Sequence, residues 1–208
     1  MKISASFLSI KEDMEKNLEK LDKTNIDYLH VDIMDGIFVP NKTSNQIIDL
    51  LKNTNKPKDV HLMVSDVKAY IDEYSKLNPV YITVHIEALS NPLEIINYIK
   101  DKNIKVGFSI KPNTDIEILK PYLEYLDLIL VMSVEPGKGG QEFIGSSKEK
   151  IDMLKELQKD YHYLIEVDGG INKETIKHCQ NADIVVIGSY ITNSTDYNEK
   201  VDSIKNEC

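Results

Sequence analysis

The feature that constrains this chain most is a regular alternation of short β-branched runs and longer segments with apolar residues at every third or fourth position. Eight such pairs follow one another, which indicates a parallel sheet with a helical crossover after each strand. We expect the strands at residues 2–8, 27–33, 58–63, 80–85, 104–110, 127–133, 162–167 and 183–188.

Helix signals lie between these strands. Segments 9–12 and 114–117 both read Ser/Thr-x-x-Glu, the spacing of a capping box. Asn91-Pro92 places a cap before a proline at the first helical position. We therefore expect helices to begin at these three places.

A sheet of this kind is either open and doubly wound or closed into a (β/α)₈ TIM barrel. We favour the closed, eight-stranded parallel barrel because the count is eight and polar residues end several different strands, as in barrel enzymes. The chain has 208 residues, against ~250 for a typical barrel, so its loops must be short. No linker or strong internal repeat stands out, and we expect residues 1–208 to form a single α/β domain.

The formal net charge of −9 argues against a surface for nucleic acid or an anionic membrane, because both require a basic patch. All 25 basic residues are lysines, so no guanidinium fork is available for a phosphate group. Backbone N–H groups, hydroxyls or a lysine would have to hold any phosphate, and this predicts glycine-rich loops at helix N-termini.

The amino end does not have the pattern of a signal peptide, because charged residues soon follow a short, serine-broken apolar stretch. The longest apolar run, Leu128–Met132, is far shorter than the ~18 residues of a transmembrane helix. Cys179 and Cys208 imply no disulfide framework. We expect a soluble cytoplasmic protein with no membrane or nucleic-acid partner, and the sequence leaves open whether it forms a homo-oligomer.

The most informative strand carries His30, Asp32 and Met34. Alternate residues of a strand share a face, so these three side chains point the same way, which can be the interior of a barrel. A His and an Asp that point inward together are costly unless they bind something. The alternative interpretation is a buried hydrogen bond between the two.

Two other strands end in residues of the same kind. His61 lies near the end of the strand that follows, and Asp168 ends a later strand before two glycines. The four side chains that gather at strand ends in this way are those of His30, Asp32, His61 and Asp168. Two imidazoles with two carboxylates suit one divalent metal cation such as Zn²⁺, Fe²⁺, Mn²⁺ or Co²⁺.

Two glycine-rich stretches follow late strands, at Glu135–Gln141 and Val186–Ser189, and the Asp168–Gly170 loop lies between them. Each alone is also an ordinary turn, but loops after the seventh and eighth strands of a barrel commonly hold phosphate.

Methionines and a further histidine also lie near strand ends. Met34, Met63 and Met132 either fill gaps in the core or form an apolar wall around the metal. His85 either hydrogen-bonds a metal ligand or Ser6, or is a polar residue at the rim.

Taken in order from residue 3 to residue 189, these motifs resemble the ribulose-phosphate 3-epimerase family. The matching segments are Ile3–Ser9, His30–Gly36, Phe38–Asn41, Asp59–Val64, Val106-Gly107, Lys111-Pro112, Val131–Gln141 apart from Lys138, Glu166–Ile171 and Gly188-Ser189. Two positions depart from the family pattern: Ile37 stands where a histidine is common, which we expect to change the rim only, and Lys138 replaces an aromatic residue. That lysine either contacts the phosphate or faces water.

The resemblance implies a metal-dependent barrel enzyme with its metal held by His30, Asp32, His61 and Asp168. It also implies that Asp32 and Asp168 are the catalytic acid and base. The substrate contacts it implies come from Ser6, His61, Gly137, Lys138, Gly139, Gly140, Asp168, Gly169, Gly170, Gly188 and Ser189.

The expected reaction interconverts D-ribulose 5-phosphate and D-xylulose 5-phosphate by two-carboxylate proton transfer at C3 through an enediolate, within carbohydrate metabolism and the pentose phosphate pathway. A D-allulose-6-phosphate 3-epimerase is the alternative with the same chemistry on a longer ketose phosphate. A non-catalytic sugar-phosphate-binding barrel is a remoter one.

Overall fold

The structure is a computed structural model that describes residues 1–10, 12–44 and 46–207, so Cys208 lies outside the described residues. Its eight strands form one closed parallel barrel in chain order, in which β1 also pairs with β8. The strands are β1 (Lys2–Ser6), β2 (Tyr28–Met34), β3 (Lys58–Met63), β4 (Tyr81–His85), β5 (Lys105–Ile110), β6 (Leu128–Met132), β7 (Leu164–Asp168) and β8 (Ile184–Ile187). The expected TIM barrel is therefore confirmed, and the open sheet is excluded.

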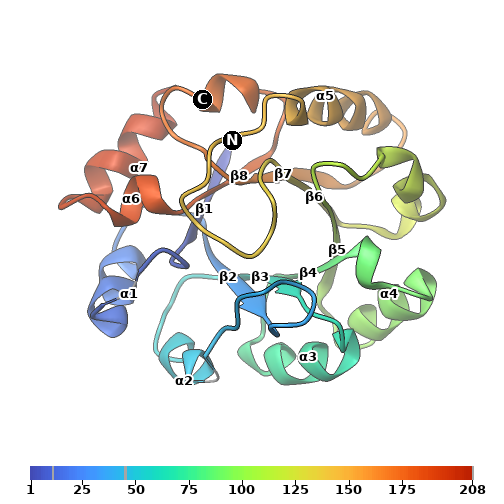
Figure 1. Cartoon of the computed structure of the whole chain (residues 1–208), viewed down its shortest axis with the longest axis horizontal. Coiled ribbons are helices and arrows are strands. Elements are labelled where there is room, and N and C mark those ends of the chain that lie inside the picture. The colour runs from blue at the N-terminus through green and yellow to red at the C-terminus, as the bar shows by residue number, and fades with distance from the viewer. Residues whose placement is uncertain (11, 45, 208) are drawn as a thin grey trace.

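Helices surround the barrel on its outside, as Figure 1 shows. The α-helices are α1 (Met14–Asp22), α2 (Ile47–Leu51), α3 (Val67–Tyr74), α4 (Pro92–Lys100), α5 (Ser147–Leu157), α6 (Ser189–Thr192) and α7 (Tyr197–Lys205). Segments of 3₁₀ helix lie at Ser75–Leu77, Ile86–Ala88, Ile116–Tyr125 and Ile176–His178. Among the described residues, no helix is both long enough and apolar enough to span a membrane.

The strand boundaries agree with the sequence pattern to within two residues at each end. The proline signal is also confirmed, because α4 begins at Pro92 directly after Asn91. Apolar periodicity and a proline at the first turn are local properties of the chain, and the closed barrel does not override them.

The two helix starts predicted from the capping-box spacing are wrong. The helix α1 begins only at Met14, after Asp13, and no side chain in the described part of the chain caps it. Asp115 rather than Thr114 caps the 3₁₀ segment that follows β5. The Thr114 hydroxyl donates instead to Glu87. This hydroxyl therefore makes a tertiary contact and not the helix cap that the local pattern predicted.

The barrel interior changes character along its axis. Near the amino ends of the strands it is filled by an apolar cluster that includes Tyr28, Tyr81, Leu128 and Ile184. Toward the carboxyl ends it becomes polar, with several buried side chains that can ionise or hydrogen-bond: Ser4, His30, Asp32, Asp59, His61, Thr83, His85, Ser109 and Glu166. The polar layers therefore rest on an apolar base and face the end of the barrel where the strands point.

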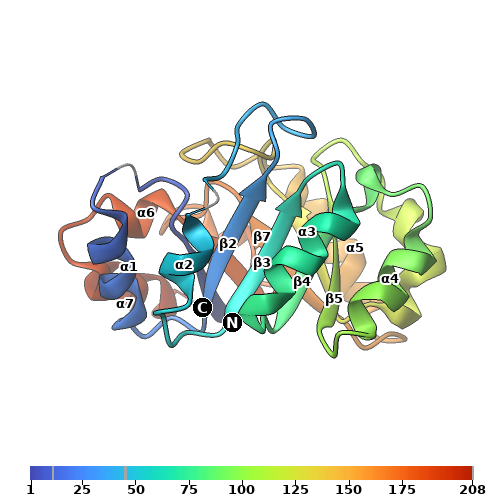
Figure 2. The same cartoon turned by 90° about the horizontal axis from the view of Figure 1, so that it is seen from below.

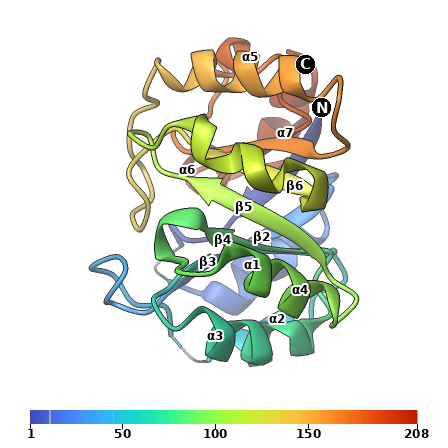
Figure 3. The ribbon, with the colours of Figure 1, turned by 90° about the vertical axis from the view of Figure 1, so that its right-hand side faces the viewer.

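Two loops rise beyond that end of the barrel. They follow β2 and β6 and project past the strand tips in Figures 2 and 3. In Figure 1 the loop after β6 curves over the middle of the barrel. Active sites of TIM barrels lie at this face.

One close approach inside the barrel provides a test of its packing. Gly107 of β5 pairs with Thr83 of β4, and a Cβ at position 107 would lie 2.2 Å from Thr83 Oγ1. Gly107→Ala should therefore lower the free energy of unfolding by about 1–3 kcal/mol, the usual cost of overpacking a core. Urea unfolding followed by circular dichroism measures this.

Gly145→Ala is the matched control, because apart from Gly145 and its two chain neighbours no described residue has a heavy atom within 4 Å of a Cβ at that position. It should change stability by no more than about 0.5 kcal/mol. Thr83→Ala should recover part of the loss in the Gly107→Ala background, since it removes the clashing hydroxyl. Equal stability of the two alanine variants would contradict this packing.

Candidate active site

Four of the residues singled out in the sequence meet at the carboxyl end of the barrel. His30 and Asp32 come from β2, His61 from β3 and Asp168 from β7. The parallel register places Asp32 beside His61, whereas Asp168 approaches from across the barrel interior. One nitrogen or oxygen atom from each of the four side chains lies within 4.8 Å of the others.

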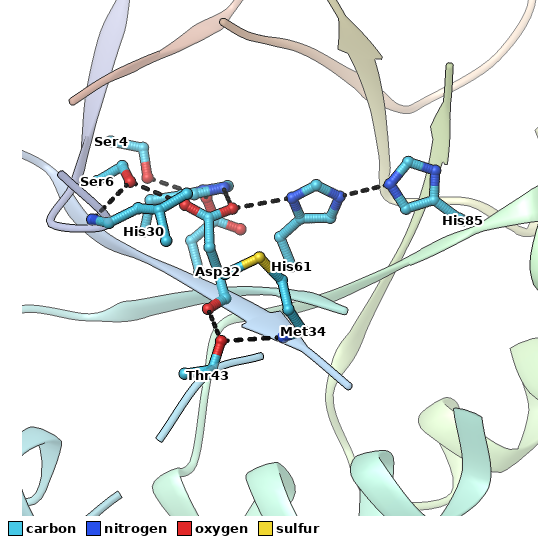
Figure 4. Close-up of polar contacts among 10 residues, drawn as sticks. Ser4, Ser6, His30, Asp32, Met34, Thr43, His61 and His85 are labelled. Atoms are coloured by element: carbon cyan, nitrogen blue, oxygen red, sulfur yellow. Dashed lines mark hydrogen bonds and ion pairs between the residues drawn. The ribbon is translucent and has the colours of Figure 1, made fainter. Parts of the chain in front are cut away.

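Asp32 is at the centre of this group (Figure 4). Its Oδ1 lies 3.2 Å from His61 Nδ1 and 3.4 Å from His30 Nε2. Its Oδ2 accepts a hydrogen bond of 2.8 Å from the Ser6 hydroxyl, and its backbone carbonyl accepts one of 3.0 Å from Thr43. One carboxylate oxygen is thus fixed by a hydroxyl, while the other is left facing two imidazoles.

His30 is held from behind by Asp59. The His30 Nδ1 to Asp59 Oδ2 distance is 2.6 Å, and the same oxygen accepts a hydrogen bond of 2.9 Å from Ser4. The other ring nitrogen, Nε2, is buried and has no hydrogen-bond partner among the described residues. Buried polar atoms are rarely left unpaired, and metal-binding histidines typically donate their second N–H to a carboxylate. The donor set therefore fits a divalent metal.

His61 is held by a second histidine. Its Nε2 lies 3.0 Å from His85 Nε2, and His85 Nδ1 lies 3.2 Å from Glu87 Oε2. His85 is fully buried, so it is not a rim residue. We expected His85 to hydrogen-bond either a metal ligand or Ser6. The structure has the contact with His61, and the Ser6 hydroxyl bonds Asp32 instead.

The two carboxylates that face the pocket differ electrostatically. Burial raises the pKa of Asp168 to about 7, and the negative charge of Asp32 adds to this effect. Burial also opposes ionisation of Asp32, but the charge of His30 and the close contacts of both imidazoles with its carboxylate hold the pKa of Asp32 well below its ordinary value. A pair of carboxyl groups with separated pKa values can act as base and acid.

Burial and neighbouring charges also act on the imidazoles. Burial lowers the pKa of His30, but the charges of Asp59 and Asp32 outweigh it and raise that pKa well above its ordinary value. Burial lowers the pKa of His61, and it lowers that of His85 to about 4. For Glu87, hydrogen bonds outweigh burial and lower its pKa to about 2.

Sequence reasoning missed two acidic residues beneath this group. Asp59 and Glu166 are fully buried, and each lies within 4.8 Å of His30 through one ligand atom. Burial, with the charge of Asp59, raises the pKa of Glu166 well above its ordinary value. The sequence does contain a signal for them, because side chains alternate between the two faces of a strand. Asp59 therefore shares a face with His61, and Glu166 shares one with Asp168.

A pocket lined by Asp32 and Asp168 lies at this end of the barrel. Of the substrate-contact residues expected from the sequence, all but His61 line it: Ser6, Gly137, Lys138, Gly139, Gly140, Asp168, Gly169, Gly170, Gly188 and Ser189. Asp32, Met63 and Met132 line it too, whereas His61 is fully buried behind Asp32. Met34 packs with Met63 and Val39 instead.

The glycine-rich walls of this pocket are built by close backbone approaches. Gly137 has φ +99°, and a Cβ there would lie 2.7 Å from Val39. Asn41 also donates a hydrogen bond of 2.7 Å to the Gly137 carbonyl, so the loops after β2 and β6 support each other. At the β7 end, the Ser133 hydroxyl lies 2.8 Å from the carbonyl of Asp168 and 2.7 Å from that of Gly169.

Comparisons with known proteins agree with this geometry. A profile of the ribulose-phosphate 3 epimerase family matches residues 2–192. A Helicobacter pylori protein named ribulose-phosphate 3-epimerase is 39% identical over 213 residues, which cover 99% of this chain and 97% of that protein. A Schizosaccharomyces pombe protein of the same name is 35% identical, over 93% of this chain and 87% of that protein.

Among solved structures, 3-hexulose-6-phosphate synthase from Salmonella typhimurium superposes with a TM-score of 0.73 at 17% identity, covering 100% of this chain and 98% of that one. That likeness concerns the fold alone. The family profile and the relatives go further, and the chain belongs to the ribulose-phosphate 3-epimerase family.

Proposed function

We propose that this protein interconverts D-ribulose 5-phosphate and D-xylulose 5-phosphate by inverting C3. One observation supports this most directly: Asp32 and Asp168 line the same pocket but come from β2 and β7, which are separated by β8 and β1. Inversion at one carbon needs a group on each face of the substrate, so two carboxylates from different strands suit it.

In this proposal the two carboxylates exchange roles with direction. Asp32, whose pKa is held low, removes the C3 proton from one epimer, and an enediolate forms in the substrate. Asp168, whose pKa is raised to about 7, carries a proton to the opposite face of C3. In the reverse reaction Asp168 is the base and Asp32 the acid. Ser6 keeps one oxygen of Asp32 in place throughout.

A divalent cation completes the proposed site. His30, Asp32, His61 and Asp168 would hold it, and Zn²⁺, Fe²⁺, Mn²⁺ or Co²⁺ all suit two imidazoles with two carboxylates. Bound there, it supplies stabilisation of the negative charge that develops on the substrate oxygens. An Asp with an ordinary pKa of ~3.9 is too weak a base for this C–H without such help.

The phosphate group is assigned to the glycine-rich end of the pocket. Because the chain has no arginine, we assign the phosphate to backbone N–H groups near Gly140, Gly170 and Gly188, with Ser189 and Lys138. Relatives named for ribulose phosphate favour the pentose over the six-carbon ketose.

Replacing either proposed acid–base residue should stop epimerisation. Asp32→Asn and Asp168→Asn should each lower the rate at least ~10²-fold, the usual size of an acid–base contribution. In D₂O each variant should still exchange the C3 proton of the one epimer that faces its remaining carboxylate, which NMR detects. Asp49→Asn, an exposed site on α2, is the control. Near-normal turnover with intact metal content would refute these roles.

Metal removal should reduce both activity and stability. Extensive chelation should abolish turnover, and readdition of one of the four ions should restore it. At a free ion concentration 100 times Kd, the bound ion should stabilise the fold by about 2.7 kcal/mol, which raises the melting temperature. Full activity with substoichiometric metal, measured by mass spectrometry, would contradict the metal assignment.

Lys138 provides a test of the phosphate end. Its side chain is exposed at the pocket rim, where a charge near a phosphate is worth ~1 kcal/mol in water. Lys138→Gln should therefore raise KM about fivefold with little change in kcat, and the effect should shrink in high salt. Lys148→Gln on α5 is the matched control. An unchanged KM would mean that Lys138 only faces water.

A further inference from the structure

A series of polar contacts leads away from the pocket through two buried histidines. His61 Nδ1 lies 3.2 Å from Asp32 Oδ1, and His61 Nε2 lies 3.0 Å from His85 Nε2 (Figure 4). His85 Nδ1 in turn lies 3.2 Å from Glu87 Oε2. Both histidines are fully buried, so water does not compete for the contact between their rings or for the contact of His61 with Asp32, whereas the Glu87 side chain is 20% exposed.

The direction of each hydrogen bond in this series follows from Glu87, the residue at its outer end. Glu87 Oε1 already accepts hydrogen bonds from the Lys111 N–H, at 2.8 Å, and from the Thr114 hydroxyl. A carboxylate can only accept, so the proton between Glu87 and His85 belongs to His85 Nδ1. A neutral imidazole carries a single N–H, which makes His85 Nε2 an acceptor.

The same reasoning then fixes His61. Because His85 Nε2 accepts, the proton between the two rings belongs to His61 Nε2, and His61 Nδ1 carries a lone pair. That lone pair faces Asp32 Oδ1 at 3.2 Å, and this oxygen is also an acceptor. Two acceptors at this distance leave a place for a cation between them.

Glu87 is firmly anchored. The segment after β5 that it contacts is held in turn by Lys150 of α5, whose Nζ donates to the carbonyls of Lys111, Pro112 and Thr114 at 3.1, 2.6 and 2.5 Å. On the other side, the Phe38 ring covers His85, with 4.9 Å between ring centroids. Neither Glu87 nor His85 is therefore placed to turn away from the other.

We propose that Glu87 is a positioning residue that acts through His85 to hold His61 in the tautomer with an unprotonated Nδ1. Asp59 contacts His30 directly, whereas Glu87 reaches His61 through one additional ring. The inference rests on the metal group of the proposed function, because it assigns Nδ1 as the atom that His61 offers to the ion. Outer partners of this kind typically change metal affinity by ~10- to 100-fold when they are replaced.

Glu87→Gln tests the proposal with little change in shape. An amide can donate as well as accept, so it no longer dictates the direction of the hydrogen bonds. Proton–nitrogen correlation NMR on ¹⁵N-histidine-labelled, metal-free protein should show His61 Nε2–H in the native chain and a mixture of tautomers in the variant. Co²⁺ and Zn²⁺ affinity, from competition with a chromophoric chelator, should fall about 10- to 100-fold.

Lys150→Met is the matched control. It loosens the same segment around Lys111 and Thr114 but leaves the His85–Glu87 contact in place. It should lower stability without altering the His61 tautomer or the metal affinity. An equal loss of affinity in both variants would show that Glu87 has only a structural role, and unchanged affinity in Glu87→Gln would also overturn the proposal.

The native protein provides a test that needs no variant. A proton on His61 Nδ1 in the metal-free native chain would refute the inference, even if the protein epimerises ribulose 5-phosphate. Conversely, a native chain that has the expected tautomer and binds Co²⁺, but does not exchange the C3 proton, would refute the proposed function and leave the role of Glu87 standing.

Discussion

Buried carboxylates at the active end of this barrel need a positive charge beside them, and the arrangement of this end depends on that need. Asp32 and Asp59 lie on either side of His30, away from water, where an uncompensated charge is costly. A proton on His30 or an ion at its Nε2 supplies the charge. Hydroxyls of Ser6 and Ser4 each bond one carboxylate oxygen, which fixes the orientation of Asp32 and Asp59.

Closure of the barrel brings the residues of this cluster together. An open sheet would leave β7 far from β2, but in a closed barrel Asp168 reaches across the interior toward Asp32. The apolar cluster beneath, which includes Tyr28 and Tyr81, supports the polar layers from below. Ser133 of the segment after β6 holds the carbonyl of Asp168, so the end of β7 is tied to its neighbour. The scaffold thus places two carboxylates on different sides of one pocket.

The loops above the barrel are interlocked rather than independent. Asp35 accepts hydrogen bonds from the backbone of Phe38 and Ser65, and Asn41 donates to Gly137 on the opposite loop. Ile37, the position at which the family often has histidine, is 79% exposed and does not line the pocket. This departure from the family pattern therefore changes the rim and leaves the pocket wall as it is.

By itself, the sequence determined the order of the strands, their approximate bounds and the strand ends that carry His30, Asp32, His61 and Asp168. These are local properties, since burial alternates with a period of two along a strand and recurs every three to four residues along a helix. Only the tertiary structure decided which partner each side chain takes. It directs Thr114 to Glu87 rather than to a helix cap, and it buries Asp59 and Glu166 beneath His30. Such contacts join residues far apart in the chain, and no local pattern specifies them.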